Sequence, residues 1–205
     1  MEINNETTLI ILDWDDTLFP TTWIHKHKID IFNNTSLLYT KFFKNLDILL
    51  HKLFKILIQC GTVIIITNAL LNWIDISATL LPNLNNLIKN SNIKIKSARG
   101  EYSHINKDPE MWKKMAFRNE IKNITMNMDI NNIISIGDAD YEYYALINLC
   151  DNYNNINEFK LLKSIKFIRY PDIIQIYKQI ELLCECIIKV CKETSPLDLE
   201  IRCHE

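Results

Sequence analysis

Residues 8–17 read T-L-I-I-L-D-W-D-D-T, and this stretch decides the fold because an apolar run ends abruptly in acidic residues. A short aliphatic run without polar alternation is typical of a strand that is buried on both faces of a parallel sheet. The sequence therefore predicts a strand over Thr8 to Leu12. That strand presents Asp13, Asp15 and Thr17 at its carboxyl end.

Similar strand-length runs recur along the chain and alternate with segments of helical periodicity. The further expected strands are T-V-I-I-I-T-N at 62–68, I-K-I-K-S-A-R at 93–99, N-I-I-S-I-G at 132–137 and I-K-F-I-R at 165–169. The expected helices cover 36–60, 70–88, 109–122, 141–149 and 173–190. Such alternation predicts an α/β fold, a three-layer α/β/α sandwich around a mostly parallel sheet, with ligands bound beyond the carboxyl ends of the strands.

Length and composition describe an ordinary globular chain. At 205 residues the chain is long enough for one full hydrophobic core, so we expect a single domain over 1–195 and a loosely held C-terminal tail over 196–205. Apolar residues make up 48% and the formal net charge is -2, a balance that does not fit a disordered chain. It also gives no electrostatic reason to expect nucleic acid or a membrane as partner.

The absence of targeting signals and of paired cysteine motifs indicates where the protein is located and whether its cysteines are reduced. The N-terminus carries acidic and polar residues where a signal peptide would be basic and then apolar, and no apolar run has the length of a membrane span. We therefore expect a cytoplasmic protein. No C-x-x-C spacing occurs, so free thiols are expected for all of Cys60, Cys150, Cys184, Cys186, Cys191 and Cys203.

Residues suited to phosphate chemistry stand at three of the expected strand ends. Besides the first acidic cluster, Thr67 and Asn68 end the second strand, and Gly137, Asp138 and Glu142 follow the fourth. Lys113 and Lys114 lie near the start of the helix between them. Each of these pieces is a weak signal alone, but their fixed order along an alternating chain is hard to obtain by chance.

Taken in this order, the pieces resemble the four motifs of the haloacid dehalogenase-like (HAD) superfamily, over roughly residues 8 to 170. The resemblance implies a Rossmann-like parallel sheet with strand order 5-4-1-2-3. It also implies that Asp13 is the nucleophile, Asp15 the acid/base, Thr67 a phosphoryl ligand, Lys113 the motif III lysine, and Asp138 with Glu142 the acids of motif IV. The elements D-W-D-D-T-L-F-P, T-N-A-L-L-N-W and M-W-K-K-M-A-F further resemble a group of small HAD-like proteins of unicellular eukaryotes.

The lysine assignment has alternatives. Lys113 lies 25 residues before Asp138, which suits one helix and one strand, whereas Lys107 in N-K-D-P looks like a K-P variant of the motif but lies farther away. We favour Lys113, with Lys114 and Lys107 as the alternatives.

The chemistry of these residue types agrees with the roles that the resemblance implies. A carboxylate such as Asp13 can attack phosphorus and form an acyl-phosphate, and a second carboxyl at Asp15 can protonate the leaving oxygen. Acids gathered against a phosphate need a hard cation, so we expect Mg²⁺ held by Asp13, Asp138 and the main-chain carbonyl of Asp15, with Glu142 steadying the shell. Thr67, the backbone N–H of Asn68 and the lysine would neutralise the remaining phosphoryl oxygens.

The expected activity is therefore that of a Mg²⁺-dependent phosphomonoester phosphatase with an aspartyl-phosphate intermediate. The inserts 18–60 and 69–108 are too short for a cap domain. By resemblance, capless members have an open site and often act on proteins, nucleic acid ends or other large substrates, or borrow a lid from a partner. We therefore expect a large substrate such as a phosphoprotein. Two alternatives use the same residues or the same fold: a phosphotransferase, and a non-catalytic interaction protein that docks through its open face or the helix at 173–190.

Some residues carry simpler interpretations. His25 and His27, in the loop after the first motif, are expected to be surface histidines, although they could touch substrate. Trp14 is expected to pack in the core, although it could also line the entrance of the site.

Overall fold

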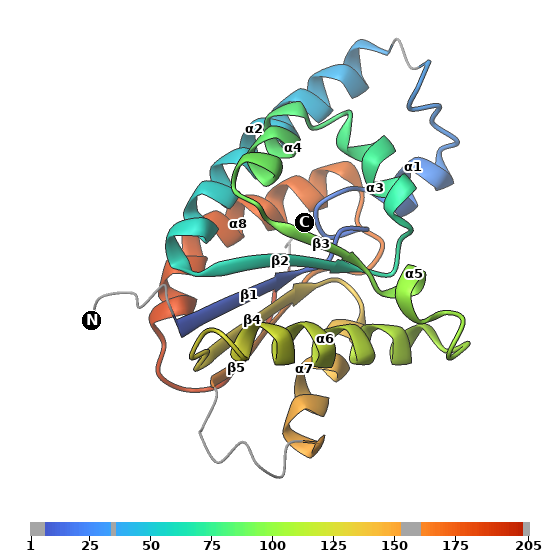
Figure 1. Cartoon of the computed structure of the whole chain (residues 1–205). Coiled ribbons are helices and arrows are strands. Elements are labelled where there is room, and N and C mark those ends of the chain that lie inside the picture. The colour runs from blue at the N-terminus through green and yellow to red at the C-terminus, as the bar shows by residue number, and fades with distance from the viewer. Residues whose placement is uncertain (1–6, 34–35, 153–160, 203–205) are drawn as a thin grey trace.

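A six-stranded parallel sheet forms the centre of the molecule (Figure 1), which a computed structural model describes over residues 7–33, 36–152 and 161–202. The strands are β1 (Thr8–Leu12), β2 (Thr62–Thr67), β3 (Lys94–Ser97), β4 (Asn132–Gly137), β5 (Leu161–Lys166) and β6 (Leu197–Glu200). Their order across the sheet is β3-β2-β1-β4-β5-β6. The α/β class and the parallel sheet are thus confirmed.

The predicted strand order 5-4-1-2-3 needs a correction, because the sheet has a sixth strand. β6 lies beyond β5 and pairs with it in parallel, from Lys163 with Leu197 to Lys166 with Glu200. Residues 197–200, expected to belong to a loose tail, therefore extend the sheet.

Helices cover both faces of the sheet. One face packs against α2 (Leu37–Cys60), α3 (Leu71–Ala78), α4 (Pro82–Asn90) and α8 (Ile173–Lys192), and the other against α5 (Ala98–Tyr102), α6 (Pro109–Thr125) and α7 (Asp140–Asn152). β1 supplies both layers by alternation, since Ile10 and Leu12 belong to the first core and Leu9 and Ile11 to the second. The short helix α1 (Thr21–Lys26) follows the turn after β1. All five residues of β1 are buried, as the unbroken apolar run predicts.

Several boundaries differ from the sequence prediction. The helical segment expected over 70–88 is two helices, because Pro82 begins α4 and the chain turns between Thr79 and Leu81. The fifth strand is not at 165–169 but at 161–166, where it pairs with β4 from Asn132 to Gly137. The short helices α1 and α5 were not predicted at all, since six and five residues show too little periodicity to be recognised.

A buried lysine on β5 holds the C-terminal end of α8. The Lys163 ammonium donates to the carbonyls of Val190 at 2.8 Å and Glu193 at 2.6 Å, and the side chain is fully buried. Main-chain carbonyls at the end of a helix lack intrahelical donors, so a cation there satisfies them and complements the helix dipole. The chain then turns back and enters β6.

Gly61 lies between α2 and β2, where the backbone passes so close to β1 that a side chain would not fit. It ends α2 in an extended conformation, with φ of 172°, so the helix end does not depend on a left-handed backbone. A Cβ added there would lie 2.4 Å from the carbonyl oxygen of Thr8 on β1. Any side chain would push β1 and the end of α2 apart.

Two sequence-level expectations concern the whole chain. In the part of the chain that the structure describes, no helix is both long and apolar enough to cross a membrane. Free thiols are confirmed at Cys60, Cys184, Cys186 and Cys191, while Cys203 and the side chain of Cys150 lie outside what the structure describes.

Candidate active site

The carboxyl ends of β1 and β4 lie side by side and bring the first and last acidic motifs together. The two strands pair directly, and the main-chain N–H of Asp13 continues the pairing by donating to the carbonyl of Ile136 at 2.9 Å. Because both strands run in the same direction, Asp13 and Asp138 leave the sheet at the same edge. Both are buried, with 7% and 6% of their surface exposed.

Lys113 is the cation at the centre of this cluster. It projects from α6, is 1% exposed, and its ammonium lies 2.6 Å from Oδ1 of Asp13, 2.7 Å from Oε1 of Glu142 and 2.8 Å from the carbonyl oxygen of Ile66 on β2. Burial alone would lower the pKa of Lys113, but the two carboxylates outweigh it and raise the pKa above its usual value. The charged ammonium of Lys113 therefore connects the carboxyl ends of β1 and β2 with the first turn of α7.

The two alternative lysines lie elsewhere. Lys114 faces outward from α6, where it pairs with Glu110 at 2.6 Å and lies 5.9 Å from the ring centre of Tyr144. Lys107 is exposed in the loop before α6. Of the three candidates, Lys113 is the one that the fold brings to Asp13.

Glu142 reaches Lys113 because residue 137 is glycine. A Cβ added to Gly137 would lie 2.4 Å from Cγ and 2.7 Å from Oε2 of Glu142. Glu142, in the first turn of α7, also accepts a hydrogen bond from the backbone N–H of Ala139, the residue just before this helix, at 3.2 Å. The missing side chain at 137 thus leaves room for the buried glutamate.

Negative charge exceeds positive charge in the cluster. Burial, together with the charges of Asp13, Glu142 and Asp16, raises the pKa of Asp138 to about 9. Thr17, fully buried, donates its hydroxyl to Oδ1 of Asp138 at 3.4 Å. Several carboxylates therefore share one ammonium, and further positive charge would stabilise the arrangement.

A tight turn follows β1 and fixes the direction of the next acids. The carbonyl of Trp14 accepts hydrogen bonds from the N–H groups of Thr17, Leu18 and Phe19, and Asp16 has a left-handed backbone with φ of 54°. Left-handed conformations are uncommon for residues with a side chain, and Asp is among those that tolerate them best. Asp16 also accepts the backbone N–H of Thr22 at 2.8 Å and so ties the turn to α1.

Asp15 accepts two hydrogen bonds that the sequence did not predict. The indole N–H of Trp73, on α3, donates to Oδ1 of Asp15 at 2.9 Å, and the hydroxyl of Thr21 donates to the same oxygen at 2.5 Å. Burial and the charge of Asp13 raise the pKa of Asp15, while these two donors oppose the rise. The other carboxyl oxygen of Asp15 has no part in these two bonds.

Thr67 and Asn68 end β2 beside the cluster. The fully buried Thr67 accepts the N–H of Ala69 at 3.0 Å through its hydroxyl oxygen. The Asn68 amide donates to the carbonyl of Pro109 at 3.1 Å, while its side-chain oxygen is buried without a hydrogen-bond partner. Asn68 therefore connects the end of β2 to the first turn of α6, the helix that carries Lys113.

The remaining aromatic and histidine residues near the turn have packing roles. Trp14 is fully buried and donates to the hydroxyl of Ser77 at 3.0 Å, which confirms its prediction as a core residue. His25 and His27 are exposed. The ring of His25 stacks on that of Trp73 with centroids 5.6 Å apart, so it covers the residue that contacts Asp15.

Mg²⁺ is compatible with the oxygen-rich character of the cluster. Hard divalent cations prefer carboxylate and carbonyl oxygens, and the excess of negative charge around Asp138 is what such an ion would compensate. Within the described ranges, no group of three or more His, Cys, Asp or Glu side chains already stands at metal-binding positions. The ligand set expected from the sequence does not need such a group, because it combines two carboxylates with a main-chain carbonyl.

Comparison of this chain with protein-family models, curated proteins and solved structures finds no match.

Proposed function

We propose that this chain is a Mg²⁺-dependent phosphomonoester phosphatase that forms an aspartyl-phosphate at Asp13 and acts on a large substrate such as a phosphoprotein. The observation that carries the proposal is the buried ammonium of Lys113 between Asp13 and Glu142, at the edge of the sheet that also carries Asp138 and Asp15. Burying such a cluster of charges costs free energy, and each of its residues is of a type that suits a step of phosphoryl transfer.

The first half-reaction is a displacement at phosphorus. Lys113 holds one oxygen of Asp13, so the other oxygen is the one that attacks the phosphoryl group. The ester P–O bond breaks, and Asp15 donates a proton to the departing alkoxide or phenoxide. A raised pKa suits Asp15 to this task, because a general acid must carry its proton near the working pH.

The second half-reaction returns the enzyme to its starting state. Asp15, now a carboxylate, removes a proton from a water molecule, and that water attacks the phosphorus of the aspartyl-phosphate. The bond between phosphorus and Asp13 breaks, which releases inorganic phosphate and restores both carboxyl groups. Thr67, the N–H of Asn68 and Lys113 would neutralise phosphoryl oxygens in both steps.

The cation would be held by Asp13, Asp138 and the main-chain carbonyl of Asp15, with Glu142 steadying the shell. When bound, it would offset the charge of the phosphoryl group and of the surrounding acids. Thr17, which donates to Asp138, would orient that ligand.

The proposal includes a HAD-type fold without a large cap domain. Strands β5, β4, β1, β2 and β3 lie in the order of that superfamily, and β6 is an addition at the edge. Described residues between 18 and 60 form α1 and α2, and those between 69 and 108 form α3, α4, β3 and α5. A site without a cap would be open to a large substrate.

Two other functions remain as alternatives to the phosphatase. A phosphotransferase would use the same residues but pass the phosphoryl group to an acceptor other than water. A non-catalytic interaction protein would not need clustered carboxylates, which repel one another in the absence of a cation.

A binding experiment tests the proposed site without any choice of substrate. Beryllofluoride mimics a phosphoryl group on a carboxylate, so we expect it to raise the thermal midpoint of the protein in the presence of Mg²⁺ and not in the presence of EDTA. Hydrolysis of aryl phosphates and phosphopeptides should likewise require Mg²⁺. A protein that shows neither effect would be better described as an interaction protein.

The contact between Trp73 and Asp15 gives a second prediction. Trp73→Phe keeps an aromatic ring but removes the donor to Oδ1 of Asp15, so kcat for an aryl phosphate should fall about tenfold or more while KM changes little. Steady-state kinetics of the purified variant measures both constants.

Trp112→Phe is the matched control for this substitution. Trp112 also donates its indole N–H, to the carbonyl of Asn106 at 2.6 Å, but it does not contact Asp15. Equal kcat values for the two variants would show that the donor to Asp15 has no part in the reaction.

A further inference from the structure

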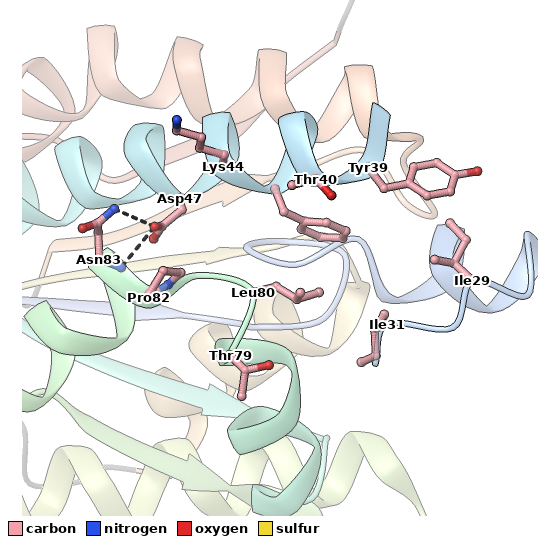
Figure 2. Close-up of a pocket in the computed structure, with 11 residues that line it drawn as sticks. Ile29, Ile31, Tyr39, Thr40, Lys44, Asp47, Thr79, Leu80, Pro82 and Asn83 are labelled. Carbon is pink, nitrogen blue, oxygen red and sulfur yellow. Dashed lines mark hydrogen bonds between the residues drawn. The ribbon is translucent and has the colours of Figure 1, made fainter. Parts of the chain in front are cut away.

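A pocket of about 400 Å³ lies beside α2, outside the cluster of acids. Figure 2 shows its walls, which come from the N-terminal half of α2, the segment after α1, and the connection between α3 and α4. The side chains that give it an apolar lining are Ile29, Ile31, Phe43, Leu80 and Pro82.

Four polar side chains of this pocket, those of Thr40, Asp47, Thr79 and Asn83, are already hydrogen-bonded within the protein. Asp47 accepts from the backbone N–H groups of Asn83 and Leu84 at 3.0 and 2.9 Å, and so caps the start of α4. The hydroxyls of Thr40 and Thr79 donate to main-chain carbonyls of their own helical turns. Because these groups are paired, the occupant that the pocket fits best is apolar.

Packed aromatic rings connect the pocket with the catalytic acid. Phe43 in the pocket stacks on Phe19 with ring centroids 5.6 Å apart, and Phe19 meets the ring of Trp73 edge-on at 6.0 Å. Trp73 donates to Asp15. Phe19 is fully buried, so this connection runs through the core of the protein. It links a side chain of the pocket to the residue that contacts Asp15, so the pocket and the acid belong to one packed part of the molecule.

One side of the pocket is formed by the segment after α1 and the first half of α2, and this part of the chain carries exposed lysines and exposed apolar residues. Between residues 25 and 48 the exposed lysines are Lys26, Lys28, Lys41 and Lys44. The acids of this stretch are Asp30 and Asp47, so lysines outnumber acids there. The apolar residues Phe32, Leu37 and Leu38 are 72%, 82% and 63% exposed. The excess of lysines in this stretch contrasts with the whole chain, which has a formal net charge of -2.

We propose that this pocket docks an acidic segment of a phosphoprotein substrate by enclosing one of its bulky apolar side chains, while Lys41 and Lys44 attract its carboxylates. This proposal rests on the phosphatase function proposed above, and it names the substrate class of that site. A concave pocket suits a protruding side chain better than the flat surface of a membrane. The paired polar groups favour an apolar side chain inside the pocket, and the basic rim formed by Lys41 and Lys44 favours acidic residues beside it.

The kinetic test compares three substrates. One is an acidic phosphoserine peptide that also carries a phenylalanine, the second is the same peptide with serine in place of phenylalanine, and the third is an aryl phosphate. Thr40→Trp fills the mouth of the pocket from an exposed position on α2. We expect this variant to raise KM about tenfold for the phenylalanine peptide alone, the effect of losing one buried apolar side chain.

Charge reversal on α2 tests the basic rim with a control on the same helix. Lys41→Glu/Lys44→Glu should raise KM for both peptides but not for the aryl phosphate. Lys52→Glu/Lys55→Glu makes the same change at exposed positions farther along α2 and should leave all three substrates unaffected. Equal effects of the two double substitutions, or no effect of Thr40→Trp on either peptide, would overturn the proposal.

A binding measurement separates this proposal from the phosphatase function. Fluorescence anisotropy with the labelled, unphosphorylated phenylalanine peptide should give a Kd that Thr40→Trp raises about tenfold, even if no phosphate ester is hydrolysed. Activity on the aryl phosphate without any peptide binding would leave the phosphatase function intact and exclude docking. Binding to anionic phospholipid vesicles but not to the peptide would identify the basic surface as a membrane contact and would also overturn the proposal.

Discussion

Asp13→Asn should abolish hydrolysis, with a fall in kcat of about 10⁴-fold or more, because an amide cannot form the acyl-phosphate. The variant should stay folded, since Lys113 keeps its contacts with Glu142 and with the carbonyl of Ile66. The measurement is the release of phosphate from an aryl phosphate at saturating substrate and Mg²⁺. In the wild type, mass spectrometry of acid-quenched protein should also find one phosphoryl group on the peptide that contains Asp13.

Asp75→Asn is the matched control, because it makes the same chemical change at an exposed position on α3. It should keep the activity of the wild type. If Asp13→Asn remained active, Asp13 would be excluded as the nucleophile, and the phosphatase mechanism proposed above would have to be abandoned.

Lys113→Met should be the most destabilising change at the site. It removes the ammonium that pairs with Asp13 and Glu142 and leaves two carboxylates buried without a cation, which typically costs about 3–5 kcal/mol of unfolding free energy. Urea denaturation followed by circular dichroism measures the loss. Activity should fall as well, because in the proposed mechanism the lysine also neutralises the phosphoryl group.

The neighbouring residue provides the control for this substitution. Lys114→Met removes a lysine that pairs with Glu110 on the surface of α6, so it should cost only about 0.5 kcal/mol. Adding Glu142→Gln to Lys113→Met should recover part of the stability, because one of the unpaired charges is then gone. Equal losses for Lys113→Met and Lys114→Met would mean that Lys113 does not form the buried ion pairs described here.

The buried strands and the acids that follow them were readable from the sequence. β1, β2 and β4 are short, largely aliphatic and buried runs, and parallel strands place their carboxyl ends at one edge of the sheet. That geometry suffices to predict that Asp13, Thr67 and Asp138 gather there. The 25-residue separation also favoured Lys113 over Lys107, in agreement with the contact to Asp13.

The parts that the sequence did not reveal depend on tertiary contacts. Trp73 lies on a helix with apolar neighbours and looks like a core residue, and only the packing of α3 against the turn after β1 brings its N–H to Asp15. β6 was missed because an edge strand has no buried run, and three of its four residues are exposed. Asp16 was not assigned a role, because its left-handed backbone leaves no mark in the sequence.

The close contacts of Gly61 and Gly137 have a consequence for how substitutions would be tolerated in this chain. Only 3 of its 205 residues are glycine, and at these two positions an added Cβ would come within 2.4 Å of the Thr8 carbonyl oxygen and of Glu142 Cγ, respectively. Two of the three glycines of this chain therefore stand where a single methyl group has no room. In natural variants, selection should therefore remove an alanine at either position faster than most changes in the surrounding core.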